Sequence, residues 1–307
     1  MTALAEAGLR IDAMRAGVID VGSNTIRLLV AADGRRGLST VLSERTHVAL
    51  AADIERSGLI SSSKLSELAE VAGDYAARAR DAGPDVLEVI VTAPGRQSDN
   101  GWLLRRVLAD ATGLPVHQLS GAEEGRLAYA GAVAGCRTVR EPLGVIDVGG
   151  GSTQLMVGTA AGPAWLQALD VGSLRLTERF VEKDPASESE LAAIAKAVEQ
   201  AFDGVTPPLP RTVLAAGGTA RALRRISGKR LGQKQLRGAL ETLTASSVQR
   251  VAKKHEISPE RARVLPAGIL VLREAHRRLG VTFEVARGGV REGAILGLLD
   301  ELAEAAA

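Results

Sequence analysis

One short pattern occurs twice in this chain and limits the folds that the chain can adopt. Residues 17–31 read GVIDVGSNTIRLLVA and residues 144–158 read GVIDVGGGSTQLMVG, which gives eight identities in fifteen aligned positions. Each copy places turn-forming residues between two runs of β-branched and aliphatic residues, which is typical of a β-hairpin. An internal repeat of this kind predicts a chain built from two structurally related halves, each with its own hairpin.

The tips of the two hairpins carry the residue types that bind phosphate and a divalent cation. Glycines let a phosphate approach the backbone, whose N–H groups can bind it together with nearby hydroxyl and amide groups. An aspartate that ends the first strand can hold Mg²⁺ directly or through water. A single hairpin of this kind could merely expose a polar turn to solvent, but the duplication favours the phosphate interpretation. The predicted phosphate-binding residues of the tips are Ser23, Asn24, Thr25, Gly149, Gly150, Gly151 and Ser152, and the predicted metal-binding residues are Asp20 and Asp147.

Composition and charge exclude several classes of protein. With 307 residues, of which 46% are hydrophobic, the chain can bury the cores of two domains and is not disordered. Its 38 basic and 36 acidic residues nearly cancel, so a site for a polyanion has to be local. The single cysteine, Cys136, excludes an internal disulfide framework and predicts a small buried residue in a reducing compartment. Residues 1–16 lack the apolar run of a signal peptide and no segment is long enough to span a membrane, so we expect a cytoplasmic protein with a loosely docked N-terminal extension.

Strand-like and helix-like patterns alternate along the rest of the chain, which predicts an α/β fold. The sequence predicts a strand or strand pair over 38–50, strands over 85–94 and 115–120, and a loop over 95–101. Helices are expected over 61–83, 102–113, 121–135, 186–202 and 257–280, and strand–turn–helix units over 212–225 and 283–305. We expect a first domain over 17–121, joined by a C-terminal helix over 292–307, and a second domain over 122–291.

Two further segments are candidates for catalysis or binding. GAEEGR puts Glu123 and Glu124 at the start of a helix, where acids are common because of the helix dipole. Beside a phosphate-binding turn, one of these carboxylates could instead serve as a general base that activates water. LAAGGTAR places Gly218 and Thr219 just before a helix, whose N-terminus could bind an anion, although packing explains such a turn equally well.

The segment 211–256 is strongly basic in a protein that is otherwise nearly neutral. It contains eleven Lys or Arg residues and only two acids, Glu241 and Glu256. Such a segment is either a solvated helical face or a positive track for a polyanion. Aromatic residues make up only 2% of the chain, so platforms that stack the bases of single-stranded nucleic acid are not expected.

Six ordered segments together resemble a known family of phosphatases. GVIDVGSNTIRLLVA, GAEEGRLAYAG, VIDVGGGST, AAGGTA, RVLPAGI and GVREGAIL, which extend from Gly17 to Leu299, are similar to motifs of the exopolyphosphatase and guanosine pentaphosphate phosphatase family. The length of the chain matches the short, two-domain members. The resemblance implies two ribonuclease-H-like domains of the actin, hexokinase and acetate-kinase superfamily, with the active site in an interdomain cleft.

The resemblance also implies an activity and a set of functional residues. Family members use Mg²⁺, with Mn²⁺ as an alternative, to release terminal orthophosphate from linear polyphosphate or the 5′ γ-phosphate from guanosine pentaphosphate. The catalytic glutamate of the family falls on Glu124, which would be the general base for the attacking water, and a metal- or phosphate-binding aspartate falls on Asp147. A phosphate-clamping arginine falls on Arg96. The implied partners are inorganic polyphosphate or guanosine pentaphosphate, without a membrane or a specific nucleic acid, and a second copy of the chain in a homodimer.

The chain departs from the family pattern at two places. Gln154 stands where the family usually has a glutamate, which removes a possible metal ligand, and Pro94 and Gly95 alter the loop that carries Arg96. A weakly catalytic sensor of polyphosphate or an alarmone therefore remains an alternative, and so does an ATP-using phosphotransferase of the same superfamily. In a chain without further C-terminal domains, we expect short polyphosphates to bind nearly as well as long ones.

Overall fold

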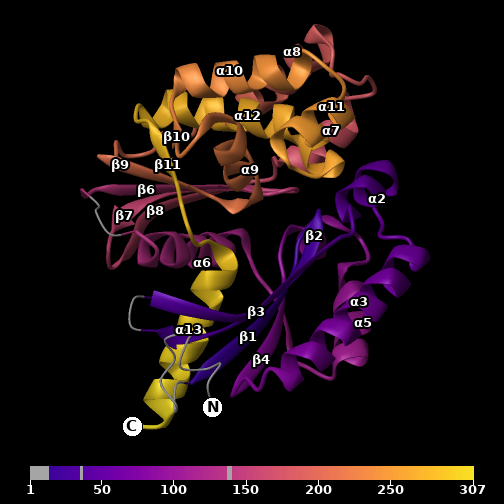
Figure 1. The fold of residues 1–307 in the computed structure, drawn as a ribbon, viewed down its shortest axis with the longest axis vertical. Helices are drawn as coiled ribbons and strands as arrows, with labels where there is room; N and C mark the ends of the chain where they lie inside the picture. The colour runs from indigo at the N-terminus through magenta and orange to yellow at the C-terminus, as the bar shows by residue number, and fades with distance from the viewer. Residues whose placement is uncertain (1–13, 35–36, 137–139) are drawn as a thin grey trace. The chain divides into compact units, whose positions relative to one another are not determined.

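The computed structural model describes residues 14–34, 37–136 and 140–307, which form two compact units (Figure 1). The first unit comprises the described residues up to Ser120 together with Val290–Ala307, and the second is Gly121–Gly289. Most of the expected N-terminal extension lies outside the described residues. Strand β1 already begins at Arg15, two residues before the predicted start of the first domain.

The first unit is a five-stranded mixed sheet in the order β3-β2-β1-β4-β5. Three antiparallel strands form one side of it, and two strands parallel to β1 form the other. The strands are β1 Arg15–Val21, β2 Thr25–Gly34, β3 Gly37–His47, β4 Val86–Val91 and β5 Val116–Gln118. The helices are α2 Leu50–Ser57, α3 Ser62–Asp81, α4 Ala93–Gln97, α5 Gly101–Thr112 and α13 Val290–Ala305. Helices α3 and α5 cover one face of the sheet, and α13 lies against β1 and β2 on the other (Figure 1).

The second unit is a six-stranded mixed sheet in the order β10-β11-β9-β6-β7-β8. Its strands are β6 Leu143–Val148, β7 Thr153–Thr159, β8 Gly162–Leu169, β9 Thr212–Ala216, β10 Arg230–Leu231 and β11 Phe283–Val285. Its helices are α6 Gly121–Ala134, α7 Ser173–Phe180, α8 Glu188–Ala201, α9 Gly217–Ser227, α10 Gln233–Thr244, α11 Val248–His255 and α12 Pro259–Leu279. Helix α6 covers one face, and α9, α10 and α12 cover the other (Figure 1).

The two sheets share one topology, which confirms the duplication that the repeated hairpin predicts. In each unit the first three strands form an antiparallel meander, and two later strands, β4 and β5 or β9 and β11, extend the sheet in parallel from the other side of the first strand. This is the strand order of ribonuclease-H-like domains. The second unit adds β10 as a short antiparallel edge strand. The predicted α/β class is therefore confirmed for both halves.

Several local predictions are confirmed and others are wrong. Helix α12 begins as expected, with the Ser258 hydroxyl accepting the main-chain N–H of Arg261 at 3.3 Å. The predicted loop over 95–101 is reduced to residues 98–100, because Pro94 suits the first turn of a helix and α4 extends to Gln97. Of the two alternatives for segment 38–50, the single strand is confirmed, since β3 runs to His47 and α2 begins at Leu50. Cys136 is half-buried instead of buried. No helix in the described ranges combines the length and apolar character needed to span a bilayer.

Candidate functional site

The two hairpin turns have the same backbone geometry. The N–H of Gly22 donates to the carbonyl of Thr25 at 3.1 Å, and the N–H of Gly149 donates to the carbonyl of Ser152 at 2.9 Å. A Cβ atom on Gly149 would lie only 3.0 Å from that Ser152 oxygen. The glycine that opens the turn in the second unit is therefore needed for its tightness.

The N-terminus of a short helix donates hydrogen bonds to the carbonyl groups of each turn. In the first unit the N–H of Ala51, in the first turn of α2, donates to the carbonyl of Ser23 at 3.1 Å. In the second unit the N–H of Leu174, in the first turn of α7, donates to the carbonyl of Gly150 at 2.9 Å. A Cβ on Gly172 would lie 2.4 Å from the same Gly150 oxygen, so α7 approaches the turn closely. Helix N–H groups that need acceptors thus fix the carbonyls of both turns on the helix side.

The turn of the first unit contains two buried polar atoms that lack a hydrogen-bond partner among the described residues. They are the Ser23 hydroxyl oxygen and the Asn24 side-chain carbonyl oxygen, in residues that are 3% and 6% exposed. A buried polar group without a partner costs about 1–3 kcal/mol. A phosphate oxygen could accept the Ser23 hydroxyl proton, and a hydrated cation could serve Asn24. Both predicted residues therefore suit a polar ligand.

An arginine cluster that the sequence did not predict surrounds Asp20. Arg27 lies directly opposite Asp20 in the β1–β2 pairing, so both side chains are on the same face of the sheet. Arg291, in the first turn of α13, has a side chain that is only 13% exposed. Burial lowers the pKa of Arg291, and the charges of Arg27 and Arg45 lower it further, whereas Glu292 and Asp20 raise it. This surrounding of cations favours charge pairing with arginine over metal binding for Asp20.

Arg96 lies on α4 in the first unit, as the predicted position requires. Its Nη1 donates to the carbonyl of Leu119 at 2.6 Å, close to the end of that unit's first segment. The bond ties α4 to the residues that follow β5. The role of Arg96 as a phosphate clamp stays a prediction.

In the second unit Asp147 and Gln154 lie side by side on the face that α6 covers. They are directly opposite in the β6–β7 pairing. The neighbours of Asp147, Ile146 and Val148, belong to the hydrophobic core on the other face, so the alternation of a strand turns Asp147 toward α6. Leu155 belongs to the same core and leaves Gln154 facing α6 as well.

Glycines from two other segments border the Asp147 carboxylate. A Cβ on Gly217, which has a φ of +80°, would lie 2.1 Å from Asp147 Oδ1. A Cβ on Gly289 would lie 4.0 Å from Asp147 Oδ2. No side chain larger than hydrogen fits between Gly217 and this carboxylate, so the backbone of the β9–α9 turn lies directly beside it.

Gln154 is buried and makes a specific contact with the turn. Its exposed fraction is 1%, and its Nε2 donates to the Ser152 hydroxyl oxygen at 3.0 Å. Because that oxygen accepts the Gln154 proton, the Ser152 hydroxyl can donate its own proton to another acceptor. A glutamate at position 154 would offer no such donor.

Glu124 lies at the same end and on the same face of this sheet. It occupies the first turn of α6 and is 7% exposed, whereas Glu123 is exposed. Helix α6 begins over the end of β8, because a Cβ on Gly121 would lie 2.6 Å from the Cβ of Ala168. Ala168 pairs with Gln154, which in turn pairs with Asp147. The helix that carries the buried glutamate therefore begins over the row of paired residues that ends at Asp147.

Gly218 and Thr219 lie beside this row in the first turn of α9 and not just before the helix as predicted, and the hydroxyl of Thr219 is already used. Thr219 is fully buried and donates its hydroxyl proton to the carbonyl of Val148 at 3.0 Å. Any contact of this turn with a phosphate would therefore come from main-chain N–H groups. The predicted role of the Thr219 side chain in binding phosphate is thus less favoured than a structural one.

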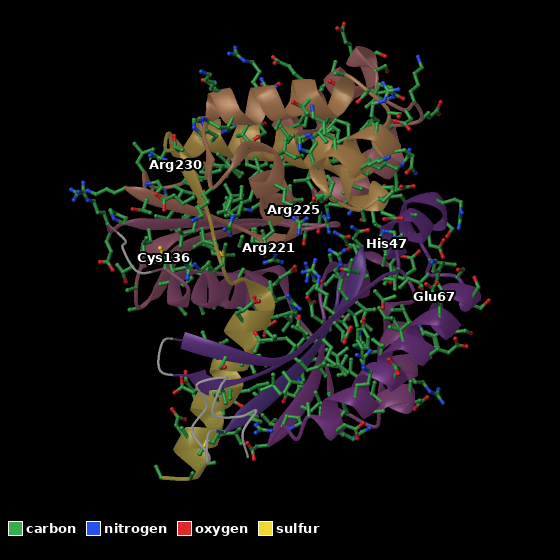
Figure 2. The ribbon with its side chains drawn as sticks, viewed as in Figure 1. His47, Glu67, Cys136, Arg221, Arg225 and Arg230 are labelled. Atoms are coloured by element: carbon green, nitrogen blue, oxygen red, sulfur yellow. The ribbon has the colours of Figure 1, made fainter. Side chains whose placement is uncertain are left out.

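The residues of the basic segment 211–256 do not form one face. Its Lys and Arg residues are distributed over α9, β10, α10 and α11, with Arg211 and Lys229 in the connections before β9 and β10, and all of them except Arg221 are exposed. Figure 2 shows Arg221 and Arg225 together on α9, and Arg230 well apart from them. Arg225 Nη1 donates to the carbonyl of Glu256 at 2.6 Å, which joins the end of α9 to the end of α11. A contiguous positive track is therefore limited to these two helix ends.

The Ppx/GppA phosphatase family matches residues 29–302. The chain belongs to this family. Among solved structures, the Aquifex aeolicus Ppx/GppA enzyme is 24% identical with a TM-score of 0.76, and the alignment covers 92% of this chain and 99% of that one. An exopolyphosphatase from Cytophaga hutchinsonii is 19% identical with a TM-score of 0.85, covering 94% and 98%. An exopolyphosphatase-like protein is 21% identical with a TM-score of 0.85, covering 95% and 99%.

The described residues of this Ppx/GppA phosphatase contain no group of three or more His, Cys, Asp or Glu side chains that could hold a metal. Mg²⁺ does not need such a group, because it keeps several waters and binds through one or two carboxylates together with substrate phosphates. Asp147, a single buried carboxylate beside the glycine backbone of Gly217 and Gly289, suits that mode of binding. Asp20 suits it less, because Arg27 lies opposite to it.

Proposed function

We propose that this Ppx/GppA phosphatase is an exopolyphosphatase that releases terminal orthophosphate from short linear polyphosphate or from the 5′ end of guanosine pentaphosphate. The observation that carries the proposal is the position of one buried carboxylate. Glu124 lies in the first turn of α6, and this helix begins over the paired residues Ala168, Gln154 and Asp147, beside a glycine-rich turn. Hydrolysis of a phosphoanhydride requires a base, a carboxylate that binds metal, and groups that donate hydrogen bonds to the phosphate.

In the proposed mechanism, Glu124 orients a water and accepts its proton as the water attacks the terminal phosphorus in line with the leaving oxygen. The Ser152 hydroxyl, whose oxygen already accepts from Gln154, donates to a phosphate oxygen, and main-chain N–H groups of Gly150 and Gly151 add donors. Mg²⁺, when bound at Asp147, would neutralise charge on the phosphates.

The first unit has phosphate-binding groups of its own. Ser23 has a buried hydroxyl that can donate, and Arg96 is anchored on α4. The arginine cluster around Asp20 adds fixed positive charge, since a guanidinium stays protonated and binds two phosphate oxygens at once. A substrate with several neighbouring phosphates suits this number of cationic groups better than a monophosphate.

Two alternatives make different predictions for the same experiment. Phosphate release is measured with Mg²⁺ for tripolyphosphate, long-chain polyphosphate, guanosine pentaphosphate and ATP at equal concentrations of phosphate ends. We expect release from tripolyphosphate or guanosine pentaphosphate, with little gain for the long chain. Tight binding of tripolyphosphate without release would refute hydrolysis in favour of a sensor. Transfer of phosphate from ATP to a small acceptor would refute it in favour of a phosphotransferase.

A further inference from the structure

The β9–α9 turn lies against a buried arginine that none of the proposed steps uses. Arg261, in the first turn of α12, is 9% exposed and is the one lysine or arginine in the described ranges that falls in the buried class. A charged side chain is rarely buried to this extent unless it is held by specific contacts. Its surroundings therefore indicate a defined role.

The guanidinium of Arg261 faces the backbone of Gly218. A Cβ on Gly218 would lie 2.9 Å from Nη2, 3.2 Å from Cζ and 3.3 Å from Nη1 of Arg261. Three nearly equal distances mean that the guanidinium plane, and not its edge, rests on this glycine. Gly268 lies seven residues further along α12 on the same helical face, and a Cβ there would lie 2.5 Å from Thr219 Cγ2. One face of α12 thus packs against Gly218 through Arg261 and against Thr219 through Gly268.

The other side of the same turn contacts the proposed metal site. Gly217 lies so close to Asp147 that a Cβ on it would be 2.1 Å from Oδ1. Thr219 fixes the turn to the end of β6 through its bond to the Val148 carbonyl at 3.0 Å. The turn is therefore a single backbone layer, with Arg261 on one side and the Asp147 carboxylate on the other.

We propose that Arg261 is a positioning residue for the reaction, which acts through the Gly217–Gly218 turn on Asp147. Its planar, always charged side chain fills the space against Gly218 and prevents the turn from moving away from the carboxylate. The inference rests on the proposed function, because it assigns Asp147 to the metal and its phosphate. A displacement of about 1 Å at a reacting group can lower a rate by about 10²-fold.

The test compares Arg261→Met and Arg261→Lys with Arg263→Met. Arg263 lies on the same helix and donates to the Val181 carbonyl at 3.1 Å, far along the chain from the turn, so it is a matched structural control. We measure kcat, KM and the Mg²⁺ concentration for half-maximal release from tripolyphosphate, with urea denaturation to correct for the folded fraction. Arg261→Met should lower kcat by about 10²-fold with a much smaller change in KM, and should raise the Mg²⁺ requirement. Arg261→Lys should recover part of the loss, and Arg263→Met should keep the kcat of the wild type.

A second substitution tests the contact itself. Gly218→Ala inserts a methyl group at the guanidinium of Arg261, so it should lower kcat in the wild type. In the Arg261→Met background the methionine side chain can bend away from this methyl group, so the same substitution should lower kcat little further. Additive losses would overturn the coupling. Unchanged kcat and Mg²⁺ requirement in Arg261→Met would overturn the positioning role while wild-type release still supports the proposed function.

A wild type without phosphatase activity would defeat the proposed function separately. Binding of Mn²⁺, followed by electron paramagnetic resonance, then tests Arg261 without turnover. Weaker binding in Arg261→Met than in the wild type and Arg263→Met would support the inference, and equal binding would overturn it.

Discussion

Replacing Gly217 by alanine should displace the Asp147 carboxylate, in addition to the cost of placing an L-residue at a positive φ. The φ of Gly217 is +80°, and an L-residue in this region costs about 1–2 kcal/mol. The new Cβ would also lie 2.1 Å from Asp147 Oδ1, whereas ordinary van der Waals contacts begin at 3.4 Å. The carboxylate or the turn must therefore move by more than 1 Å. A shift of that size should lower kcat by about 10²-fold, in addition to the loss of stability.

Gly280→Ala is the matched control for this experiment. Gly280 belongs to the same unit, has a φ of +69° and would place a Cβ with nothing within 4 Å. The control should therefore lose about 1–2 kcal/mol of unfolding free energy and keep its kcat. Both substitutions are made in a Trp102→Phe background, which leaves the half-buried Trp165 of β8 as the only tryptophan and hence as a reporter on the second unit.

The assays are urea denaturation followed by tryptophan fluorescence and phosphate release from tripolyphosphate. Gly217→Ala should be less stable than Gly280→Ala and should lose most of its activity at urea concentrations where it is fully folded. Equal stability and equal kcat in the two variants would refute the argument, because the contact with Asp147 would then have no energetic consequence.

Three further predictions concern charge in the second unit. Gln154→Glu should lower the Mg²⁺ concentration for half-maximal activity if the amide limits metal binding, and an unchanged or higher requirement would contradict that idea. The main-chain N–H and hydroxyl of Ser187 lower the pKa of Glu190 from 4.5 to about 2, so its stabilising effect is complete above pH 4.5 and disappears as the pH falls toward 2. Urea denaturation should accordingly show Glu190→Gln to be less stable than the wild type at pH 7 but equally stable near pH 2; a gap that persists at pH 2 would argue against this linkage. Neutralising Arg221 and Arg225 together should weaken binding of long polyphosphate and reduce its salt dependence, whereas Arg230→Gln, distant from both, should change neither (Figure 2).

The features that the sequence predicted well are those that depend on neighbouring residues. The hairpins follow from alternating strands around glycine turns, and their repetition predicted the shared topology of the two sheets. The position of Glu124 at a helix start follows from the same local pattern. Alternation in β6 then explains why Asp147 faces α6, although the sequence did not say which face α6 would cover.

The features that the sequence did not predict depend on packing between distant segments. Arg291 is 263 residues from the Leu28 carbonyl that it contacts at 3.5 Å, and only the return of α13 to the first unit brings it to Asp20. When the two repeats are aligned without gaps, Arg27 occupies the position of Gln154. This difference between the two copies was the one signal in the sequence for the arginine cluster. Arg261 left no such signal, since it contacts Gly218 only because α12 packs on α9.

The central claim is that Glu124 is the base of a phosphohydrolase, and one pair of variants tests it most directly. Glu124→Gln and Glu123→Gln are compared with the wild type for tripolyphosphate release and, separately, for tripolyphosphate binding by calorimetry. The amide is nearly isosteric but cannot accept the proton of the attacking water, so Glu124→Gln should lose about 10²–10⁴-fold in kcat while it binds substrate as the wild type does. Glu123 is exposed and should tolerate the same change. Near-normal turnover in Glu124→Gln, with a loss in Glu123→Gln, would contradict the account.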